Sequence, residues 1–320
     1  MKIQFFRSSL YNSWDWCQHQ TALQYAFGFH SKSGIKAAMG TITHKALQII
    51  ADQKLAIQNG QTSIDDPELG KFDVDYNDID KITTRAFAYY EKIETHLKLF
   101  HTHLAECIYN VKKALGYCNG LVNPKNKKIV ATEQFFDFPV DKPWSDDLRM
   151  KGTIDLITEI SDNIYEVIDY KTGKRIDWAT GEEKTEEKLK HDPQLLIYFF
   201  ALKRLYPDKD FIFSIFYIND GGLLSTYFDN ASLLEAEDML KRRYIEICST
   251  TEPKLLSNNQ THWKCQKLCQ FAKEEYKNTG ISVCEFMKQA IRTIGLEKSI
   301  ARYGNHDNIG NYGAGGGTVR

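Results

Sequence analysis

Long apolar runs are absent from this sequence of 320 residues. No stretch approaches the roughly 20 consecutive apolar residues that a membrane-spanning helix needs. The N-terminus, MKIQFFRSSL, also lacks the apolar stretch of a secretory signal peptide. We therefore expect a cytoplasmic protein without a membrane partner.

A net charge of appreciable size is missing too. The 41 Lys and Arg residues nearly balance the 42 Asp and Glu residues, which gives a formal charge of -1. A basic groove can be offset by acidic residues elsewhere, so this value neither suggests nor excludes a nucleic-acid partner. The composition, 42% hydrophobic and 26% charged, is ordinary for a globular protein with a sizeable core.

The cysteines do not form an even, regularly spaced set. There are seven, and in a reducing compartment such a set indicates thiols or metal ligands rather than a disulfide framework. Cys107, Cys118 and Cys248 have apolar neighbours in helical stretches, so we expect them to be buried structural thiols.

No internal repeat is evident, and the chain alternates between helical and strand patterns. Helices are expected over the segment that carries Trp14 and Cys17, over about 36–53 with His44, and through a helical insertion at 45–127 with a loop at 60–75. Strands begin near Lys128, and a helix capped by Asp192 separates them from two further strands. This order predicts an α/β or α+β fold with a central mixed sheet flanked by helices. We expect one domain over 1–300, with a cysteine-bearing region at 249–290 and a disordered Gly-rich tail at 304–320.

The segment IYEVIDYKT carries the strongest chemical signal. Alternation along this strand puts Asp169 and Lys171 on one face at the strand end. Asp155, on the preceding strand of a predicted hairpin, can bring a second carboxylate to the same place. Carboxylates can hold a divalent cation, and a lysine can orient water or stabilise charge on a phosphate, which suits phosphodiester hydrolysis.

Four short motifs occur in a defined order along the chain. They are Gly40 to His44, Gly152 to Asp155, Asp169 to Gly173 and Gln194 to Tyr198. This order resembles the RecB-like branch of the PD-(D/E)XK nucleases, whose core is similar to that of restriction endonucleases. That branch combines G-x-x-x-H on a helix, G-x-x-D and D-Y-K-T-G on strands, and Q-x-x-x-Y on a helix.

The resemblance implies roles for individual residues. His44, Asp155, Asp169 and the backbone carbonyl of Tyr170 would bind the catalytic metal, and Lys171 would be the catalytic lysine. An imidazole among carboxylates tilts the preference toward Mn²⁺, with Mg²⁺ as the other candidate. Gln194 and Tyr198 lie one helical turn apart, so they can reach the same phosphate or order the lysine.

The remaining four cysteines suggest a second metal centre. A subgroup that includes AddB-type and CRISPR-adaptation enzymes, which this chain resembles, binds a 4Fe-4S cluster through one N-terminal and three C-terminal cysteines. Here Cys17, Cys265, Cys269 and Cys284 would fill those positions. The gaps between the last three differ from the usual pattern, so a Cys₄ zinc site and simple packing of the thiols stay open as alternatives. Either metal would have a structural role.

The sequence thus predicts a metal-dependent deoxyribonuclease, with an exonuclease acting on DNA ends favoured over a site-specific endonuclease. Recombination, repair or phage DNA processing would be its setting, with a helicase or recombination protein as a possible partner. Five lysines, Lys112, Lys113, Lys125, Lys127 and Lys128, could line a strand channel or form a solvated basic face. The alternatives are a catalytically inactive DNA-binding or scaffold subunit and a metal-stabilised interaction module.

Overall fold

The computed structural model describes residues 1–75, 77–176, 181–255 and 263–305, and these group into two compact units. We name them unit 1, which comprises Met1–Lys32, Phe136–Gly152 and Leu234–Arg320, and unit 2, which comprises Ser33–Phe135 and Thr153–Leu233. Each unit joins segments that are distant in the sequence. The single domain expected over 1–300 stays a prediction, and most of the Gly-rich segment at 304–320 lies outside the described residues.

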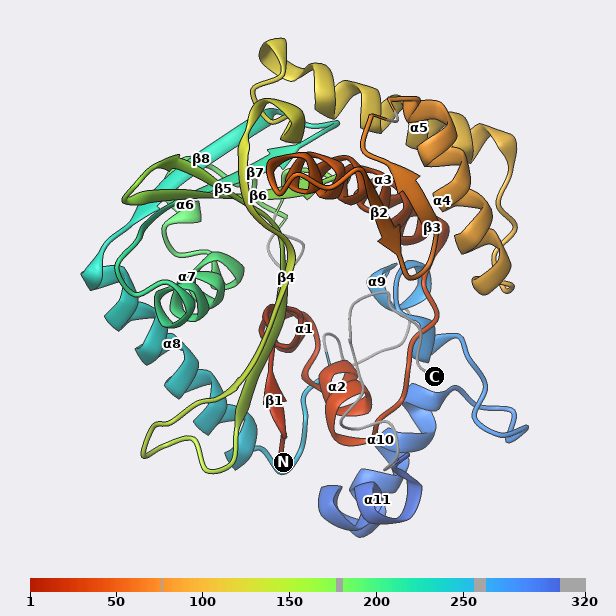
Figure 1. Ribbon diagram of the computed structural model, residues 1–320. Helices are drawn as coiled ribbons and strands as arrows, with labels where there is room; N and C mark the ends of the chain where they lie inside the picture. Colours follow the sequence, from red (N-terminus) through yellow and green to blue (C-terminus); the bar gives the residue numbers. More distant parts are fainter. Residues whose placement is uncertain (76, 177–180, 256–262, 306–320) are drawn as a thin grey trace. The chain divides into compact units, whose positions relative to one another are not determined.

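A six-stranded mixed sheet is the main β structure (Figure 1). The central strand β6 pairs antiparallel with β5 and parallel with β7, and β7 pairs antiparallel with β8. At the start of β5, β1 adds a short parallel pairing, and β4 also pairs with β5. The predicted mixed sheet flanked by helices is confirmed. The strands are β1 (Phe5–Phe6), β4 (Lys128–Pro139), β5 (Arg149–Ser161), β6 (Ile164–Lys171), β7 (Asp210–Tyr217) and β8 (Gly222–Phe228).

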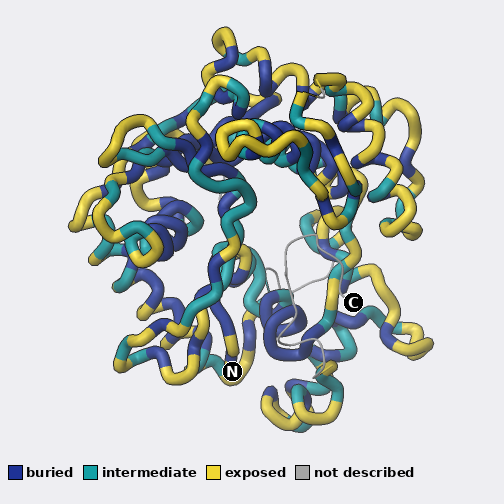
Figure 2. The backbone as a smooth tube through the Cα atoms, in the orientation of Figure 1, coloured by how far each residue is buried: buried dark blue, intermediate teal, exposed yellow. Residues whose placement is uncertain are grey.

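Helices cover both faces of the sheet in unit 2. On one face lies α7, buried along most of its length (Figure 2), with Phe199 against the rings of Phe211, Phe213 and Phe228. On the other face, a helical cluster packs on alternate strand residues such as Ile168. The two faces therefore have separate apolar cores. These helices are α3 (Ile35–Gln58), α4 (Ile79–Ile93), α5 (His101–Gly116) and α7 (Pro193–Leu205), with α6 (Glu186–Leu189) and the 3₁₀ turns at Tyr117–Asn119 and Pro124–Asn126.

A β-hairpin interrupts the helical insertion where the sequence indicated only a loop. Its strands β2 (Ser63–Asp66) and β3 (Gly70–Asp73) pair antiparallel. The buried ammonium of Lys45 lies 2.7 Å from Asp66 and 2.8 Å from Glu68. Oδ1 of Asp66 also accepts two backbone N–H groups of the turn itself, so local contacts hold the hairpin together with the ion pairs to α3.

Unit 1 is mainly helical. The predicted single helix through Cys17 is wrong, because α1 ends at Trp16 and Cys17 is extended. There its Sγ accepts the backbone N–H of Gln20 at 3.4 Å and starts a second helix. The helices are α1 (Ser8–Trp16), α2 (Gln18–Thr21), a π-helical turn (Ala22–Ala26), α8 (Asn230–Ser249, beginning in unit 2), α9 (Trp263–Lys267), a 3₁₀ turn (Gln270–Ala272), α10 (Val283–Ile294) and α11 (Leu296–Tyr303).

Two other sequence expectations concern burial. Among the described helices, none is long and apolar enough to cross a membrane. Of the three thiols expected in the interior, Cys107 is buried and Cys248 is half-buried, but Cys118 is exposed. The helical pattern fails at Cys118 because the backbone there turns into the left-handed region, with φ of 43°.

Candidate active site

The end of β6 places an acid and a lysine side by side in unit 2. Asp169 is 3% exposed, and the ammonium of Lys171 lies 2.9 Å from its Oδ1 and 2.6 Å from its Oδ2. The neighbouring strand β7 holds this strand end, since β6 pairs with it along its whole length. The alternation predicted from the sequence therefore brings the two side chains together.

Helix α7 supports Asp169 from the side. Gln194 donates from Nε2 to Asp169 Oδ1 at 2.9 Å and to the hydroxyl of Tyr198 at 3.0 Å. Asp192 caps the helix by accepting the N–H of Gln194 at 2.9 Å, and Pro193 opens it, as the sequence predicts. The cap thus fixes the turn from which Gln194 reaches the carboxylate.

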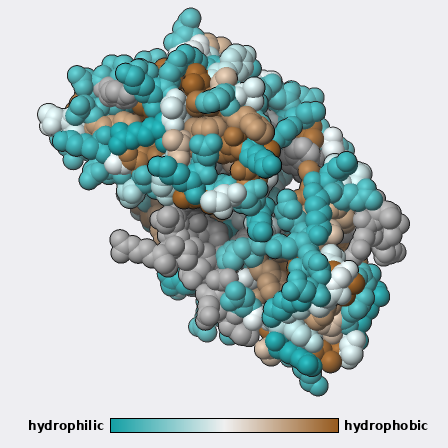
Figure 3. All heavy atoms as spheres, turned by 90° about the vertical axis from the view of Figure 1, so that its right-hand side faces the viewer, coloured by the Kyte–Doolittle hydropathy of each residue, from teal (hydrophilic) through white to brown (hydrophobic). Residues whose placement is uncertain are grey.

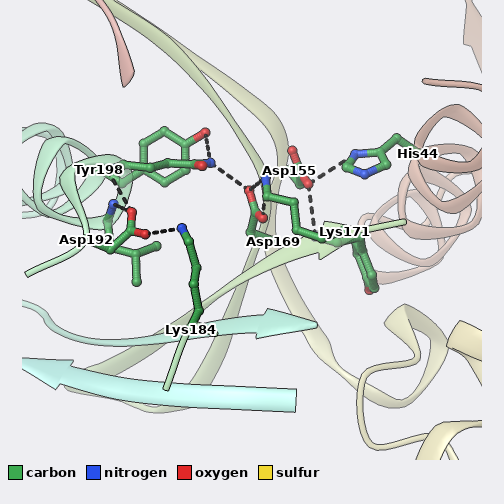
Figure 4. A network of polar contacts seen from close by, with 10 residues as sticks. His44, Asp155, Asp169, Lys171, Lys184, Asp192 and Tyr198 are labelled. Atoms are coloured by element: carbon green, nitrogen blue, oxygen red, sulfur yellow. Dashed lines mark hydrogen bonds and ion pairs between the residues drawn. The ribbon is translucent and has the colours of Figure 1, made fainter. Parts of the chain in front are cut away.

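Asp155 and His44 form the other half of the site. Nδ1 of His44, on α3, lies 3.3 Å from Oδ2 of Asp155, and the backbone N–H of Tyr170 donates to the same oxygen at 3.2 Å. Figure 4 shows His44 pointing to Asp155 from one side while Lys171 points to Asp169 beside it. A helix histidine and two strand carboxylates, far apart in sequence, therefore meet around one strand end.

In each of these groups, the effect of burial on the pKa is opposed by the charge of a neighbouring group. Burial lowers the pKa of His44, but the Asp155 carboxylate offsets this and the net pKa is raised. Burial raises the pKa of Asp155, yet His44 and Lys171 bring it below its ordinary value. Burial and the nearby Asp155 charge raise the pKa of Asp169 despite the attraction of Lys171. The two cationic groups thus face two carboxylates, and of the two aspartates Asp169 binds a proton more tightly than Asp155.

Glu133 belongs to this neighbourhood, although sequence reasoning missed it. It lies on β4 in a left-handed conformation, with φ of 42°, and its pKa is raised to about 8 by burial and by the Asp155 charge. It lines a cavity of about 10 Å³, at the lower limit of the size that can hold one water molecule. An acid in an alternating strand usually faces solvent, so no local signal in the sequence pointed to Glu133. The lining residues are His44, Leu47, Gln48, Ala51, Glu133, Asp155, Leu156 and Tyr170.

The donor set fits a divalent cation in its chemistry. Imidazole nitrogen and carboxylate oxygens suit Mn²⁺, and carboxylates suit Mg²⁺. Within the described part of the chain, the buried Oδ2 of Asp169 accepts no hydrogen bond, although Lys171 lies close enough for an ion pair. Across the same residues, however, no three His, Cys, Asp or Glu side chains are already grouped as metal ligands. Cation binding would therefore require these side chains to rearrange.

The four cysteines predicted to form a second site all lie in unit 1. Cys17 separates α1 from α2, Cys265 lies in α9, Cys269 follows two residues after that helix, and Cys284 lies at the start of α10. Burial raises the pKa of Cys265 and that of Cys269, the latter to about 11; Cys17 adds to both shifts, and Cys265 adds to that of Cys269. Burial and the three other thiols also raise the pKa of Cys284. The structure thus brings these thiols within electrostatic reach of one another.

The five lysines considered for a strand channel mostly have acidic partners. Lys112 pairs with Asp80 at 2.6 Å, and two others on β4 or next to it pair with carboxylates of β5 and β6. Charged and polar side chains cover much of the face in Figure 3, with apolar groups scattered between them. This pairing favours a solvated, charge-balanced face. The other pairs are Lys127 with Glu166 at 2.8 Å and Lys128 with Glu159 at 2.6 Å.

Comparison with known proteins agrees with the motif order. The family model of the PD-(D/E)XK nuclease superfamily matches residues 11–286. The chain therefore belongs to the PD-(D/E)XK nuclease superfamily, as the sequence predicted.

Individual relatives are distant. A solved structure named "Putative exonuclease" from Eubacterium rectale aligns with a TM-score of 0.46 and 9% identity, covering 88% of this chain and 92% of the other. No curated protein matches the sequence significantly. The RecB-like branch and the cysteine-bound cluster are finer assignments than these comparisons give.

Proposed function

We propose that this protein is a metal-dependent DNA nuclease of the RecB-like branch. His44, Asp155, Asp169 and the backbone carbonyl of Tyr170 would hold Mn²⁺ or Mg²⁺. The observation that carries the proposal is the ammonium of Lys171 paired with the buried Asp169 beside the His44–Asp155 pair. A structural ion pair would not need a histidine and a second carboxylate at the same strand end.

The side chains divide the chemistry of phosphodiester hydrolysis. A bound divalent cation supplies Lewis-acid activation of water and of the phosphate. Lys171 orients the attacking water or stabilises the negative charge that grows on the phosphate oxygens. Asp169 keeps the ammonium at this position, and its own orientation is fixed by the amide of Gln194. Tyr198, bonded to the same amide, limits the rotation of Gln194.

DNA ends are the proposed substrate, so the reaction is exonucleolytic. The support is the resemblance of the four motifs to those of the RecB-like branch, whose members usually act on DNA ends. The proposed setting is recombination, repair or phage DNA processing, with a helicase or recombination protein as partner.

We further propose that Cys17, Cys265, Cys269 and Cys284 bind a structural metal centre, a 4Fe-4S cluster with Zn²⁺ as the alternative. The support for this centre is that Cys17, from the N-terminal part of unit 1, raises the pKa values of the three C-terminal thiols, which burial raises most. Metal binding requires these thiols to lose their protons, and it would then link the two ends of the unit.

The test compares linear and covalently closed circular DNA, each single- and double-stranded, with Mn²⁺, Mg²⁺ or EDTA. The native protein, purified anaerobically, should degrade end-labelled linear DNA with either ion, spare closed circles and stop in EDTA. Asp169→Asn, which keeps the shape of the side chain, should be inactive. Cleavage of circles would replace the exonuclease assignment with an endonuclease.

The competing function is an inactive DNA-binding or scaffold subunit. It predicts that native protein and Asp169→Asn are equally inert with both ions while both still bind DNA. That result would overturn the nuclease proposal.

A further inference from the structure

A pocket in unit 1 has no part in the site described above. Its volume is about 340 Å³, in the range of small-molecule binding sites. It lies between the start of α2, the segment after α8 and one face of α10. The backbone fixes this arrangement, because His19 donates its N–H to the carbonyl of Lys254 at 3.1 Å and Lys254 donates to the Gln18 side chain at 3.0 Å.

The pocket carries an excess of positive charge. Lys254, Lys288 and Arg292 line it, and Glu252 is the acidic lining residue. Lys288 and Arg292 are one helical turn apart on α10, so they share a face. Lys288 pairs with Glu285 at 3.3 Å. In the described part of the chain, neither Lys254 nor Arg292 has an ion pair.

The absence of ion pairs at Lys254 and Arg292, among the described residues, distinguishes this pocket from the lysines of unit 2 that were considered for a strand channel. There, lysines such as Lys112 and Lys128 are neutralised by carboxylates at 2.6 Å. Two cations that line one cavity and have no acidic partner among the described residues form a better site for an external anion. Phosphate groups are the anions that Lys and Arg side chains bind in nucleic acids.

The rest of the lining is apolar. Pro253 and Ile291 are buried, and Leu255 is half-buried beside them. His19, 2% exposed, is bound through Nε2 to the carbonyl of Cys284 at 3.1 Å, so its ring forms part of a fixed wall. A cationic rim beside an apolar wall matches a nucleotide, whose phosphate is charged and whose sugar and base have apolar faces.

We propose that this pocket binds one nucleotide of a DNA strand, with the phosphate held by Lys254 and Arg292 and the sugar and base against Pro253, Leu255 and Ile291. The inference rests on the proposed function for the identity of the ligand, but not on cleavage.

The experiment measures binding without hydrolysis. Fluorescence anisotropy in EDTA follows a labelled oligodeoxythymidylate of about 12 nucleotides, a length typical of single-strand sites, over a series of salt concentrations. The variant Lys254→Ala/Arg292→Ala should bind severalfold more weakly. The slope of log K against log salt should fall by about 0.7, because both cations hold the same phosphate and one lost phosphate contact on single-stranded DNA removes about 0.7.

Two matched variants control the test. Lys241→Ala/Lys298→Ala removes the same charge from exposed positions of unit 1 outside the pocket and should keep the native slope. Lys254→Arg/Arg292→Lys keeps the charge and should retain most of the binding. Thermal unfolding checks that each variant is folded.

Two outcomes overturn the proposal. One is a pocket variant that binds like the native protein, and the other is an equal loss in the control, which would reflect overall charge. The nuclease proposal is tested separately, by cleavage assays with Mn²⁺ or Mg²⁺. A protein that binds DNA through this pocket but never cleaves it would support the pocket proposal and contradict the nuclease proposal.

Discussion

The carboxylate site of unit 2 and the cysteine group of unit 1 differ in how their charges are balanced. In unit 2, Lys171 and His44 face Asp169 and Asp155, so each charge has an opposite partner at 3.3 Å or less. In unit 1, burial raises the pKa values of Cys269 and Cys284, and neighbouring thiols of the set raise them further, so without a metal these two groups are stable as neutral thiols. A site with opposite charges is held in place by its own residues, whereas a site with ligands of one sign reaches its binding form only when a metal displaces the protons.

Removing the lysine from the balanced site should give the largest effect. Lys171→Ala should lower DNA cleavage about 10²–10³-fold, as loss of one group that stabilises transition-state charge does. The fold should persist, since Gln194 still donates to Asp169. Initial rates on end-labelled DNA measure the effect, with the exposed Lys174→Ala as the matched control. Equal rates for the two variants would remove Lys171 from the mechanism.

Removing one thiol should disrupt the site whose charges have one sign. Cys269→Ser should lose bound iron or zinc, and its melting temperature should fall by about 5–10 °C, because a few kcal/mol of metal-linked stability are lost. Metal analysis and thermal unfolding measure both. The exposed Cys118→Ser is the control. Native metal content in Cys269→Ser would exclude this residue as a ligand.

Glu133 is a third acid beside the carboxylate site of unit 2, and its ionisation adds a negative charge that has no cationic partner of its own among the described residues of the site. Its pKa of about 8 means that the folded protein binds this proton more tightly than the unfolded chain does. Ionisation therefore costs stability progressively as the pH rises from the ordinary carboxyl range, about 4.3, to about 8.

Glu133→Gln removes that cost. The measured quantity is the melting temperature of the variant minus that of the native protein, in EDTA. This difference should grow from pH 5 to pH 9, by about 2–4 °C for each kcal/mol of stability recovered. Thermal unfolding across this pH range measures it, with the exposed Glu91→Gln as control. A difference that does not change with pH would show that Glu133 is not titrating as described.

The smallest effect should come from the support around α7. Lys184 pairs with Asp192, the residue that caps this helix and positions Gln194. Lys184→Ala should slow cleavage about two- to fivefold, since a partly exposed ion pair contributes up to about 1 kcal/mol. Steady-state rates should show this, while Lys188→Ala, which removes an exposed pair with Glu182, should match the native protein.

Much of the fold was predictable because its signals are local. Alternation in the β6 segment put Asp169 and Lys171 on one face, and Asp192 with Pro193 marked the start of α7 correctly. Errors occurred where distant residues decide the local structure. Lys45 on α3 pairs with Asp66 of the β2–β3 hairpin, and the break at Cys17 separates two helices that the apolar pattern joined.

The sequence by itself determined the superfamily, the mixed sheet and the residues that converge at the end of β6, since side-chain direction follows from the periods of strand and helix. Only the tertiary structure decided that Glu133 lies beside Asp155, that the lysines near β4 are neutralised, and that Lys254 and Arg292 share a pocket. Those relations join segments far apart along the chain. Packing creates them, and no local pattern encodes them.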